Sequence, residues 1–378
     1  MPTIRDRVTL YLIKETLHHI FPNSVNKKLP NNYIKDLRNF YELKSSKGLH
    51  YIKTDIKTFY DAIQHKQLLV ILKKKIKSKK LLKLIESALK TPTVPHNYSK
   101  SDGKKYKRVK GVPQGLSISN ILANIYLDEF DQKMSSKGEM YIRYVDDILI
   151  VAKDTSVNDI KKTIIDELTT LDLSVNELKT DDAPIAQPHE MLGYKISSTL
   201  TSVKDSNKKR FITAIAAKIS SYHYKNEERK KKSPWLTTEV QKLVFIEDLN
   251  EKITGAISDK KRYGWLFYFS EITDMSILHK IDKIIAGLFT RLKDFDNKAP
   301  DNLKRLSKAY YKIKKSPTSG YIHQYKKYET IAEKMKYLED RGYLNPASKY
   351  DQKEVLRIFD RVRQKNLAGL TLDVGFTS

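Results

Sequence analysis

Cysteine is absent from the 378-residue chain, so the protein has no disulfide bonds and no zinc site built on thiolates. Both absences are typical of the reducing cytosol. No run of apolar residues is long enough to cross a bilayer, and the N-terminal sequence lacks the layout of a signal peptide. We therefore expect a cytoplasmic protein without a membrane partner. Hydrophobic residues make up 40% of the chain, enough for a folded protein of two or three domains.

Acidic residues are too few to balance the basic ones. Lys and Arg number 71 against 45 Asp and Glu, which gives a formal net charge of +26 over a chain that also has 23 tyrosines. Positive charge attracts phosphates, and aromatic rings stack on bases. Nucleic acid is thus the expected partner. An anionic membrane is disfavoured because no membrane-binding amphipathic helix or lipidation site is evident.

The most informative stretch is residues 141–152, which reads as two strands rich in Ile, Val and Tyr with Asp146 and Asp147 where they meet. A turn of this kind normally contains Gly, Asn or Pro. Two adjacent carboxylates beside apolar strands repel each other unless a cation neutralises them, and a divalent metal is the natural candidate. An isolated Asp-Asp pair is more often a solvated hairpin tip, but the apolar flanks favour the metal.

A second acidic strand precedes this hairpin. The strand predicted across residues 50–56 carries Asp55 near its end and leads into a helix at about Thr58, which Asp55 could alternatively cap. If the two strands pair, the carboxylates of Asp55 and Asp146 converge and can hold two Mg²⁺ ions about 3.5–4 Å apart. Mg²⁺ needs no His or Cys ligands. Nucleotidyl transfer to a 3′-hydroxyl is the chemistry that this pattern predicts.

Helical periodicity and turn residues predict the remaining elements. Before residue 205 we expect strands interleaved with helices, which favours an α+β domain. A Pro-Gln-Gly turn leads into a helix that Ser117 or Ser119 could cap. The expected segments are helices at 3–20, 32–43 and 156–173, a basic loop at 95–110 and one short strand at 190–196.

Beyond residue 205 the pattern is almost wholly helical, with a helix at 211–224 and an exposed linker at 226–234. The aromatic run at 263–269 fits the core of a helix better than a platform for stacked bases, although its composition suits either.

Five segments in this order resemble the motifs of reverse transcriptases: 54–60 (TDIKTFY), 112–119 (VPQGLSIS), 144–147 (YVDD), 178–180 (LKT) and 191–194 (MLGY). Their order and spacing match across roughly residues 1–200. The opening residues 2–8 resemble the first fingers motif of bacterial, group II intron-like enzymes, without the basic, glycine-containing strand that usually precedes it.

The resemblance implies a right-hand polymerase fold of the α+β class. It places the fingers and palm in residues 1–204, with the fingers at about 1–50 and 62–110. A helical thumb at 205–300 and a helical C-terminal extension at 301–378 complete the expected all-helical second half.

The resemblance also implies residue roles. Asp55 and Asp146 match the metal ligands, with the backbone of Ile56 as a third donor and Asp147 as the supporting carboxylate. The implied cofactor is a pair of Mg²⁺ ions, for which Mn²⁺ could substitute. Lys179 matches a lysine that protonates or neutralises pyrophosphate; without the order of the motifs, a cation at a helix end would be the preferred explanation.

Other matches concern the nucleotide and the primer. Tyr60 matches the bulky residue under the deoxyribose that excludes a 2′-hydroxyl, and Gln114 matches a residue beside the incoming nucleotide. Arg5 and Arg7 are weaker candidates for template or triphosphate contact. The primer grip corresponds to Leu192, Gly193 and Tyr194. As alternatives, Tyr60 could be plain core, Gly193 a bulge, and the two arginines a basic first turn with Asp6 as their local partner.

Within the family, the chain most resembles the defence-associated bacterial enzymes of the antiphage, abortive-infection-like groups. Retron enzymes carry Val-Thr-Gly soon after the primer grip, whereas this chain has Ile-Thr-Gly only at 253–255. Intron proteins usually add a maturase region and often a zinc-binding endonuclease. The expected partners are dNTPs, a non-coding RNA template, the DNA product, and a second defence protein or further copies of the chain.

Two other functions stay open from the sequence. One is template-independent or protein-primed DNA synthesis at the same site, for which the tyrosines offer many hydroxyls. The other is a catalytically silent, RNA-binding scaffold. The intact carboxylates at positions 55, 146 and 147 disfavour the scaffold, because it has no use for an acidic cluster that nothing neutralises.

Overall fold

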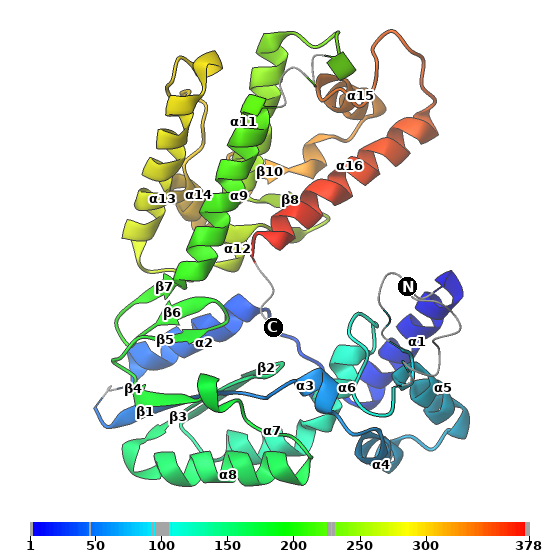
Figure 1. Ribbon diagram of the computed structural model, residues 1–378, viewed down its shortest axis with the longest axis vertical. Helices are drawn as coiled ribbons and strands as arrows, with labels where there is room; N and C mark the ends of the chain where they lie inside the picture. Colours follow the sequence, from blue (N-terminus) through cyan, green and yellow to red (C-terminus); the bar gives the residue numbers. More distant parts are fainter. Residues whose placement is uncertain are drawn as a thin grey trace. The chain divides into compact units, whose positions relative to one another are not determined.

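A computed structural model of the chain describes residues 3–44, 47–92, 94, 106, 108–224, 228 and 231–374. Contacts divide the chain into two compact units (Figure 1). The first consists chiefly of Met1–Met191 with Ser197–Thr199, and the second of Leu192–Ile196 with Leu200–Thr377. Most of the predicted basic loop at 95–110 lies outside the described residues, as do four of the nine positions of the predicted linker at 226–234.

The first unit is built on a four-stranded sheet in the order β2-β3-β1-β4. The strands are β1 (Leu49–Asp55), β2 (Met140–Tyr144), β3 (Asp147–Lys153) and β4 (Asp181–Pro184), and each neighbouring pair is antiparallel. Five consecutive residues of β3 are buried, which is the pattern of a strand covered on both faces. The predicted pairing of the two acidic strands is therefore confirmed.

Helices surround this sheet, and α7 and α8 run below it in Figure 1. The predicted helices at 3–20 and 32–43 are confirmed, and the one at 156–173 ends three residues early, where Asp172 adopts a positive φ of 53°. The helices are α1 (Ile4–Ile20), α2 (Pro30–Leu43), α3 (Phe59–Ala62), α4 (His65–Lys75), α5 (Lys79–Leu89), α6 (Ser119–Tyr126), α7 (Asp128–Ser135) and α8 (Val157–Thr170).

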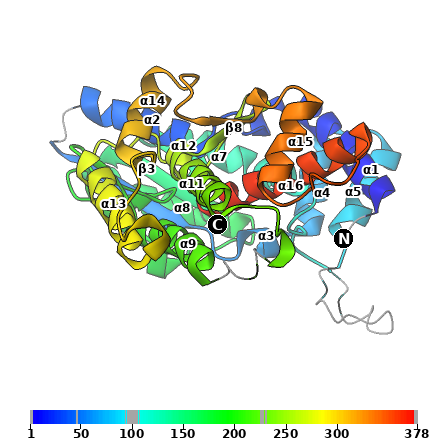
Figure 2. The same ribbon diagram turned by 90° about the horizontal axis from the view of Figure 1, so that it is seen from above.

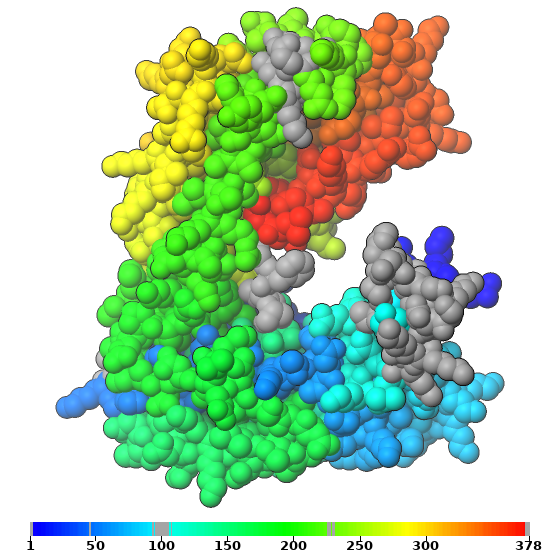
Figure 3. Space-filling view, viewed as in Figure 1, coloured from blue at the N-terminus to red at the C-terminus, as the bar shows by residue number. Residues whose placement is uncertain are grey.

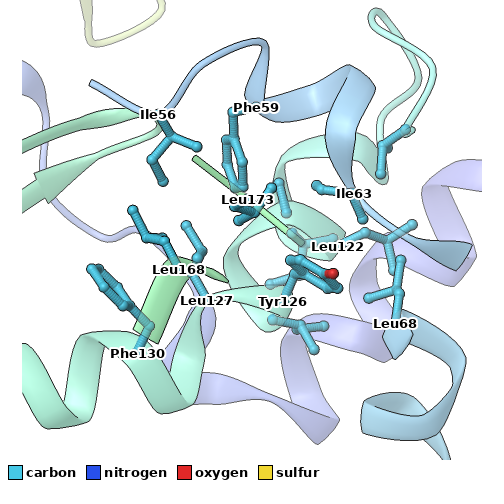
Figure 4. Packing of buried hydrophobic residues seen from close by; sticks show 14 of the residues in the cluster. Ile56, Phe59, Ile63, Leu68, Leu122, Tyr126, Leu127, Phe130, Leu168 and Leu173 are labelled. Carbon is cyan, nitrogen blue, oxygen red and sulfur yellow. The ribbon is translucent and has the colours of Figure 1, made fainter. Parts of the chain in front are cut away.

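One apolar core fixes the end of β1 where the acidic residues lie. Ile56 and Phe59 follow the strand directly and pack with Leu122, Tyr126 and Leu168, all at most 3% exposed (Figure 4). Full burial of such a side chain contributes about 1.5–3 kcal/mol. Packing against this core therefore holds the backbone at the end of β1 in place.

Two local predictions in the first 200 residues are wrong. Neither Ser117 nor Ser119 caps α6: Ser119 is its first residue and donates its hydroxyl to the carbonyl of Pro113, 2.5 Å away. The strand predicted at 190–196 is interrupted by a turn, because Leu192 and Gly193 have φ values of 50° and 79°. The turn separates β5 (His189–Met191) from β6 (Tyr194–Ile196), and β6 pairs with β7 (Thr201–Val203).

The second unit is mainly helical, as predicted. Figure 3 shows α13 in yellow and the α15–α16 pair in orange and red, with the green helices α9 and α11 between them, and Figure 2 gives the same unit from above. Its helices are α9 (Asp205–Tyr224), α11 (Thr238–Thr254), α12 (Trp265–Tyr268), α13 (Met275–Leu288), α14 (Leu306–Lys315), α15 (Ile331–Asp340) and α16 (Gln352–Leu372). The division of this half at residue 300 stays a prediction.

The expectation of an all-helical second half is wrong in one detail. Three short strands form a sheet in the order β10-β8-β9, with bounds Ala256–Ser258 (β8), Lys261–Tyr263 (β9) and His323–Gln324 (β10). The turn between β8 and β9 consists of Asp259 and Lys260, both with positive φ, which is the geometry of tight hairpins. The aromatic run at 263–269 is core, as expected, since Trp265 and Phe269 are fully buried. Over the described ranges, no helix is long and apolar enough to cross a membrane.

Candidate active site

Three acidic residues lie at one end of two neighbouring strands. The register of β1 and β3 places Asp55 directly opposite Asp147, and Asp146 occupies the turn that leads into β3. The N–H of Ile56 donates to the carbonyl of Asp146 at 3.1 Å, which ties the turn to the end of β1. Asp55 is only 4% exposed. The structure thus brings together the carboxylates that the sequence singled out.

The cluster carries negative charge that is only partly compensated. Burial, opposed in part by the charge of Lys53, raises the pKa of the Asp147 carboxyl to about 6, and the carboxylates of Asp146 and Asp55 add to the rise. A carboxyl with such a pKa ionises at a higher pH than usual, so its charged form is one that a nearby cation would stabilise.

Lys179 supplies one cation. Its Nζ donates to Oδ2 of Asp55 at 2.8 Å, and this bond raises the pKa of Lys179. The lysine ends a short 3-10 helix (Glu177–Lys179), and the N–H of Asn176 donates to the Asp55 carbonyl at 2.7 Å. An ion pair with the acidic cluster was not predicted, because the resemblance assigns this lysine to pyrophosphate.

The donor set fits a hard divalent cation. In the part of the chain that the structure describes, no three His, Asp or Glu side chains are arranged to hold a metal ion together. Mg²⁺ does not require such a cage, since it commonly binds through one or two carboxylates plus water and substrate phosphates. Asp55 and Asp146 offer those oxygens. Burial and then the charges of these two carboxylates raise the pKa of Asp147 beside them.

Arg143 is a residue that sequence reasoning missed. Its guanidinium forms a two-pronged ion pair with Asp131 of α7, with Nε–Oδ1 and Nη2–Oδ2 distances of 2.7 and 2.5 Å. The same group donates through Nη1 to the carbonyl of Val145 at 2.9 Å, and Tyr141 donates its hydroxyl to Asp131. Only its place in an otherwise apolar strand could have drawn attention to it.

The contact with Val145 matters because of its backbone. Val145 has a φ of 59°, which costs a β-branched residue about 1–3 kcal/mol. The hydrogen bond from Arg143 to the Val145 carbonyl holds the turn in this conformation and helps to offset the cost. Asp131 neutralises the charge of the Arg143 guanidinium. The Arg143 guanidinium therefore positions the turn that presents Asp146 and Asp147.

Tyr60 stands beside the carboxylates. It is half-buried against the core, and its pKa is raised by burial and then by the charge of Asp146, so its hydroxyl stays protonated near neutral pH. The N–H of Val112 donates to the Tyr60 carbonyl at 2.6 Å, and that of Gly111 to the Ile63 carbonyl at 2.7 Å. The loop before the Pro-Gln-Gly turn is thereby bound to the backbone of α3.

Gln114 is exposed at the wall of a hollow of about 510 Å³ between the loop, α1 and α5. Arg5 and Arg7 are exposed at the start of α1, and neither forms an ion pair with any residue that the structure describes. Asp6 forms no ion pair with either, because its carboxylate accepts from Thr3 in a capping box, and the charge of Arg5 adds only a lesser lowering of the Asp6 pKa. The structure does not bring either arginine into contact with the described carboxylates.

The predicted primer-grip residues belong to the second unit. Leu192 and Gly193 form the turn before β6, and the carbonyl of Leu192 accepts from the hydroxyl of Tyr268 at 3.1 Å. Tyr194 is fully buried and donates to the carbonyl of Tyr268. A side chain at Gly193 would approach the amide of Asn207 within 2.4 Å, so this glycine provides both a turn and a close approach rather than a bulge.

Comparison with known proteins gives a consistent assignment. The family model described as "Reverse transcriptase (RNA-dependent DNA polymerase)" matches residues 1–196. A 91 kDa protein in the cob intron of Schizosaccharomyces pombe is 39% identical over 82 residues, which is 22% of this chain and 9% of that protein. The putative COX1/OXI3 intron 2 protein of Saccharomyces cerevisiae is 33% identical over 89 residues, or 24% of this chain and 10% of that protein. The matches thus span about a tenth of each relative.

Two solved structures show a distant likeness. Apo telomerase from Candida tropicalis has a TM-score of 0.40 and 16% identity, covering 96% of this chain and 59% of the telomerase chain. Telomerase from Candida albicans with a TWJ fragment of telomeric RNA has a TM-score of 0.41 and 15% identity, covering 77% and 57% of the two chains.

Proposed function

The chain belongs to the reverse transcriptase family, and from this premise we propose that it is an RNA-directed DNA polymerase that adds dNTPs to a primer hydroxyl. One observation carries the proposal: the register that sets Asp55 opposite Asp147, with Asp146 in the adjoining turn. Two paired strands end in three carboxylates, and this arrangement suits nucleotidyl transfer, which needs positioning and charge neutralisation more than covalent chemistry.

The residues that would hold divalent ions are Asp55 and Asp146, with the backbone of Ile56 beside them. When bound, two Mg²⁺ or Mn²⁺ ions would promote attack by the primer hydroxyl and neutralise the leaving pyrophosphate. Asp147 supports the site as a nearby charge. The register that pairs Asp55 with Asp147, the hydrogen bond from the Ile56 N–H to the Asp146 carbonyl, and the raised pKa of Asp147 support this assignment.

The other side chains act on the nucleotide. Lys179 neutralises Asp55 before substrate binds, and its ammonium group can turn to the pyrophosphate once metal ions satisfy that carboxylate. Tyr60 limits the space beneath the sugar, so that a 2′-hydroxyl is excluded. Gln114 borders the nucleotide site, and Arg5 and Arg7 contact the template or triphosphate. Leu192, Gly193 and Tyr194 guide the primer strand.

The proposed partners follow from charge and family. A net charge of +26 suits an RNA template and its DNA product. A non-coding RNA as template, antiphage defence as the setting, and a homo-oligomer or a second defence protein stay predictions from the sequence. The relatives named above are intron proteins, so they lend the defence role no support.

The test is extension of a labelled primer on an RNA template. Asp55→Ala and Asp146→Ala should each lower incorporation of dNTPs by at least about 1,000-fold, because each removes a charge from the reacting centre. Asp182→Ala is the matched control, since it removes a carboxylate of the same sheet that pairs with Lys161 instead, and it should leave incorporation nearly unchanged.

Incorporation that persists in both Asp55→Ala and Asp146→Ala would overturn the mechanism. Products made by wild type without any template would favour template-independent or protein-primed synthesis, and sequencing of the products distinguishes these cases. RNA binding without incorporation on any template would identify a silent scaffold.

A further inference from the structure

The outer face of α14 in the second unit is almost wholly basic. Lys308, Tyr311, Lys312 and Lys315 follow one another at spacings of three, one and three residues, which places them on a single helical face. Tyr311 is 52% exposed. The opposite face is the one that packs inward, through Leu306, Ala309, Tyr310 and Ile313. An apolar inner face explains the helix, but not the choice of side chains on its outer face.

Tyr321 extends this face beyond the helix. Nζ of Lys304 lies 5.2 Å and Nζ of Lys308 lies 5.1 Å from the centroid of the Tyr321 ring. The N–H of Arg305 donates to the Tyr321 hydroxyl at 2.9 Å. We call the resulting set the basic strip: Lys304, Arg305, Lys308, Tyr311, Lys312, Lys315 and Tyr321.

The basic strip lacks acidic partners. Residues 301–328 contain eight Lys and Arg but a single acid, Asp301. Across the described ranges, no cation of the strip forms an ion pair, whereas neighbouring Lys314 pairs with Glu271 at 3.0 Å. Burial and then the charge of Lys327 lower the pKa of Lys304, and the charge of Glu247 opposes them only in part. Such a surface repels itself unless an anion covers it.

A hollow of about 380 Å³ adjoins the strip. Its walls include Ile285, Pro300 and Leu303, and Lys304 and Arg305 lie at the same opening. Asp282 also lines the hollow, and its carboxylate accepts from the N–H groups of Leu306 and Ser307. Apolar walls beside cations suit a nucleobase whose phosphates lie outside. Stabilisation of the helix dipole accounts for lysines in the last turn of α14, such as Lys312 and Lys315, but not for Lys304 or Lys308 before it.

We propose that the basic strip is a binding surface for single-stranded RNA, with the lysines on phosphates and Tyr311 and Tyr321 beneath bases. Interleaved cations and exposed aromatic rings are the chemistry by which proteins bind single strands without sequence preference. The strip lies outside the residues that match the family model, which end at 196. The inference rests on the proposed function, because it assigns the RNA of that reaction a second surface.

The test measures binding of a fluorescent oligouridylate about 20 nucleotides long, by anisotropy, without metal or dNTPs. The triple variant Lys308→Gln/Lys312→Gln/Lys315→Gln should bind at least about 10-fold more weakly at low salt, and its slope of log Kd against log salt should fall by about 2. Tyr311→Ala should weaken binding about 5-fold or more without changing that slope, because it removes stacking and no charge.

The matched control is Lys349→Gln/Lys353→Gln/Lys365→Gln, which removes the same charge from exposed positions in and beside α16. Figure 2 shows α14 and α16 well apart within this unit. Equal loss in both triple variants, or wild-type binding by the α14 variant, would overturn the proposal. Thermal unfolding verifies that each variant is folded. An oligothymidylate of the same length distinguishes RNA from DNA. Tighter binding of that DNA would overturn the proposal and show that the strip binds the DNA product instead.

Failure of this proposal is distinguishable from failure of the polymerase. Asp55→Ala should bind the oligouridylate as wild type does, since Asp55 is not part of the strip. Loss of incorporation with normal RNA binding concerns the carboxylates, whereas loss of binding in the α14 variant alone concerns the strip.

Discussion

The ammonium group of Lys179 lies 2.8 Å from Oδ2 of Asp55, so a cation already neutralises the carboxylate proposed as a metal ligand. The side chain of Lys179 is 55% exposed and that of Asp55 only 5%, which leaves the lysine able to move while the acid is fixed. A metal ion and this ammonium group compete for the same oxygen. The lysine therefore has opposite effects on metal binding and on catalysis.

Replacing Lys179 by Met should separate these effects. The apparent Kd for Mg²⁺, followed by thermal shift without substrate, should fall because the competing cation is gone. The kcat for dNTP incorporation should drop by about 10- to 100-fold, because the pyrophosphate loses its positive partner.

Lys161→Met provides the control for that experiment. It removes a lysine that pairs with Asp182 in the same unit, at 2.5 Å. Neither the Mg²⁺ affinity nor kcat should change appreciably. Weaker Mg²⁺ binding in Lys179→Met would contradict the competition.

Replacing Arg143 by Gln tests its role in positioning the acidic turn. Loss of the guanidinium leaves Asp131 without its partner and the Val145 carbonyl without its donor, so the free energy of unfolding should fall by about 3 kcal/mol. The kcat should fall about 10- to 100-fold as the carboxylates shift, while KM for dNTP stays nearly constant. Denaturant unfolding and steady-state primer extension provide the two readouts.

Arg143→Lys should recover only part of both losses, because an ammonium group cannot reproduce the two-pronged contact. Lys133→Gln is the matched control. It breaks a partly exposed ion pair between α7, the helix that carries Asp131, and Glu167 of α8, and should cost less than about 1 kcal/mol. A change in KM alone for Arg143→Gln would show that Arg143 contacts substrate instead.

Tyr60 is expected to select the sugar through its ring. Tyr60→Ala should reduce discrimination between dNTPs and NTPs by about 10- to 100-fold, since the space beneath the sugar opens. Tyr60→Phe keeps the ring and should discriminate as wild type does. The measurement is the ratio of kcat/KM for dNTP to that for NTP. Unchanged discrimination in Tyr60→Ala would show that Tyr60 is only a core residue.

Much of the site could be predicted from local pattern. Apolar residues predicted both strands: they are interrupted by polar ones in the strand that ends in Asp55 and continuous in the strand that begins at Asp147. Strands buried in this way are expected to pair. The register was not predictable. It sets Asp147 rather than Asp146 opposite Asp55, because the tight turn at Val145 and Asp146 takes up the intervening residues. A turn that uses a positive φ at valine has no sequence signal.

The features that escaped prediction depend on distant residues. Arg143 acquires its role from Asp131, on another element, and Lys179 from Asp55, 124 positions away. The sheet of the second unit was missed because its strands are two or three residues long, which is too short to show an alternating pattern of apolar and polar residues. Its hairpin turn, Asp259-Lys260, also lacks the glycine that usually marks such turns.

Asp147 should make stability depend on pH in an unusual direction. Its pKa in the fold is about 6, above the ordinary 3.8, so the folded state holds a proton that the unfolded state releases between these values. The free energy of unfolding therefore falls as pH rises from about 4 to 6, because the folded state must give up this proton. The total loss due to the Asp147 carboxyl is up to about 3 kcal/mol. Asp147→Asn should then be more stable than wild type at about pH 7.5, and the difference should shrink towards pH 4.5.

Denaturant unfolding at both pH values measures this difference, and Asp159→Asn, at an exposed position of α8, should change stability by less than about 0.5 kcal/mol at either. Mg²⁺ adds a further check. If the ion binds beside Asp147, it stabilises the charged wild-type site by linkage and narrows the gap to Asp147→Asn at the higher pH. A gap that is equal at both pH values would mean that the carboxyl of Asp147 is ionised throughout, and that its charge is already balanced by Lys53 and Lys179.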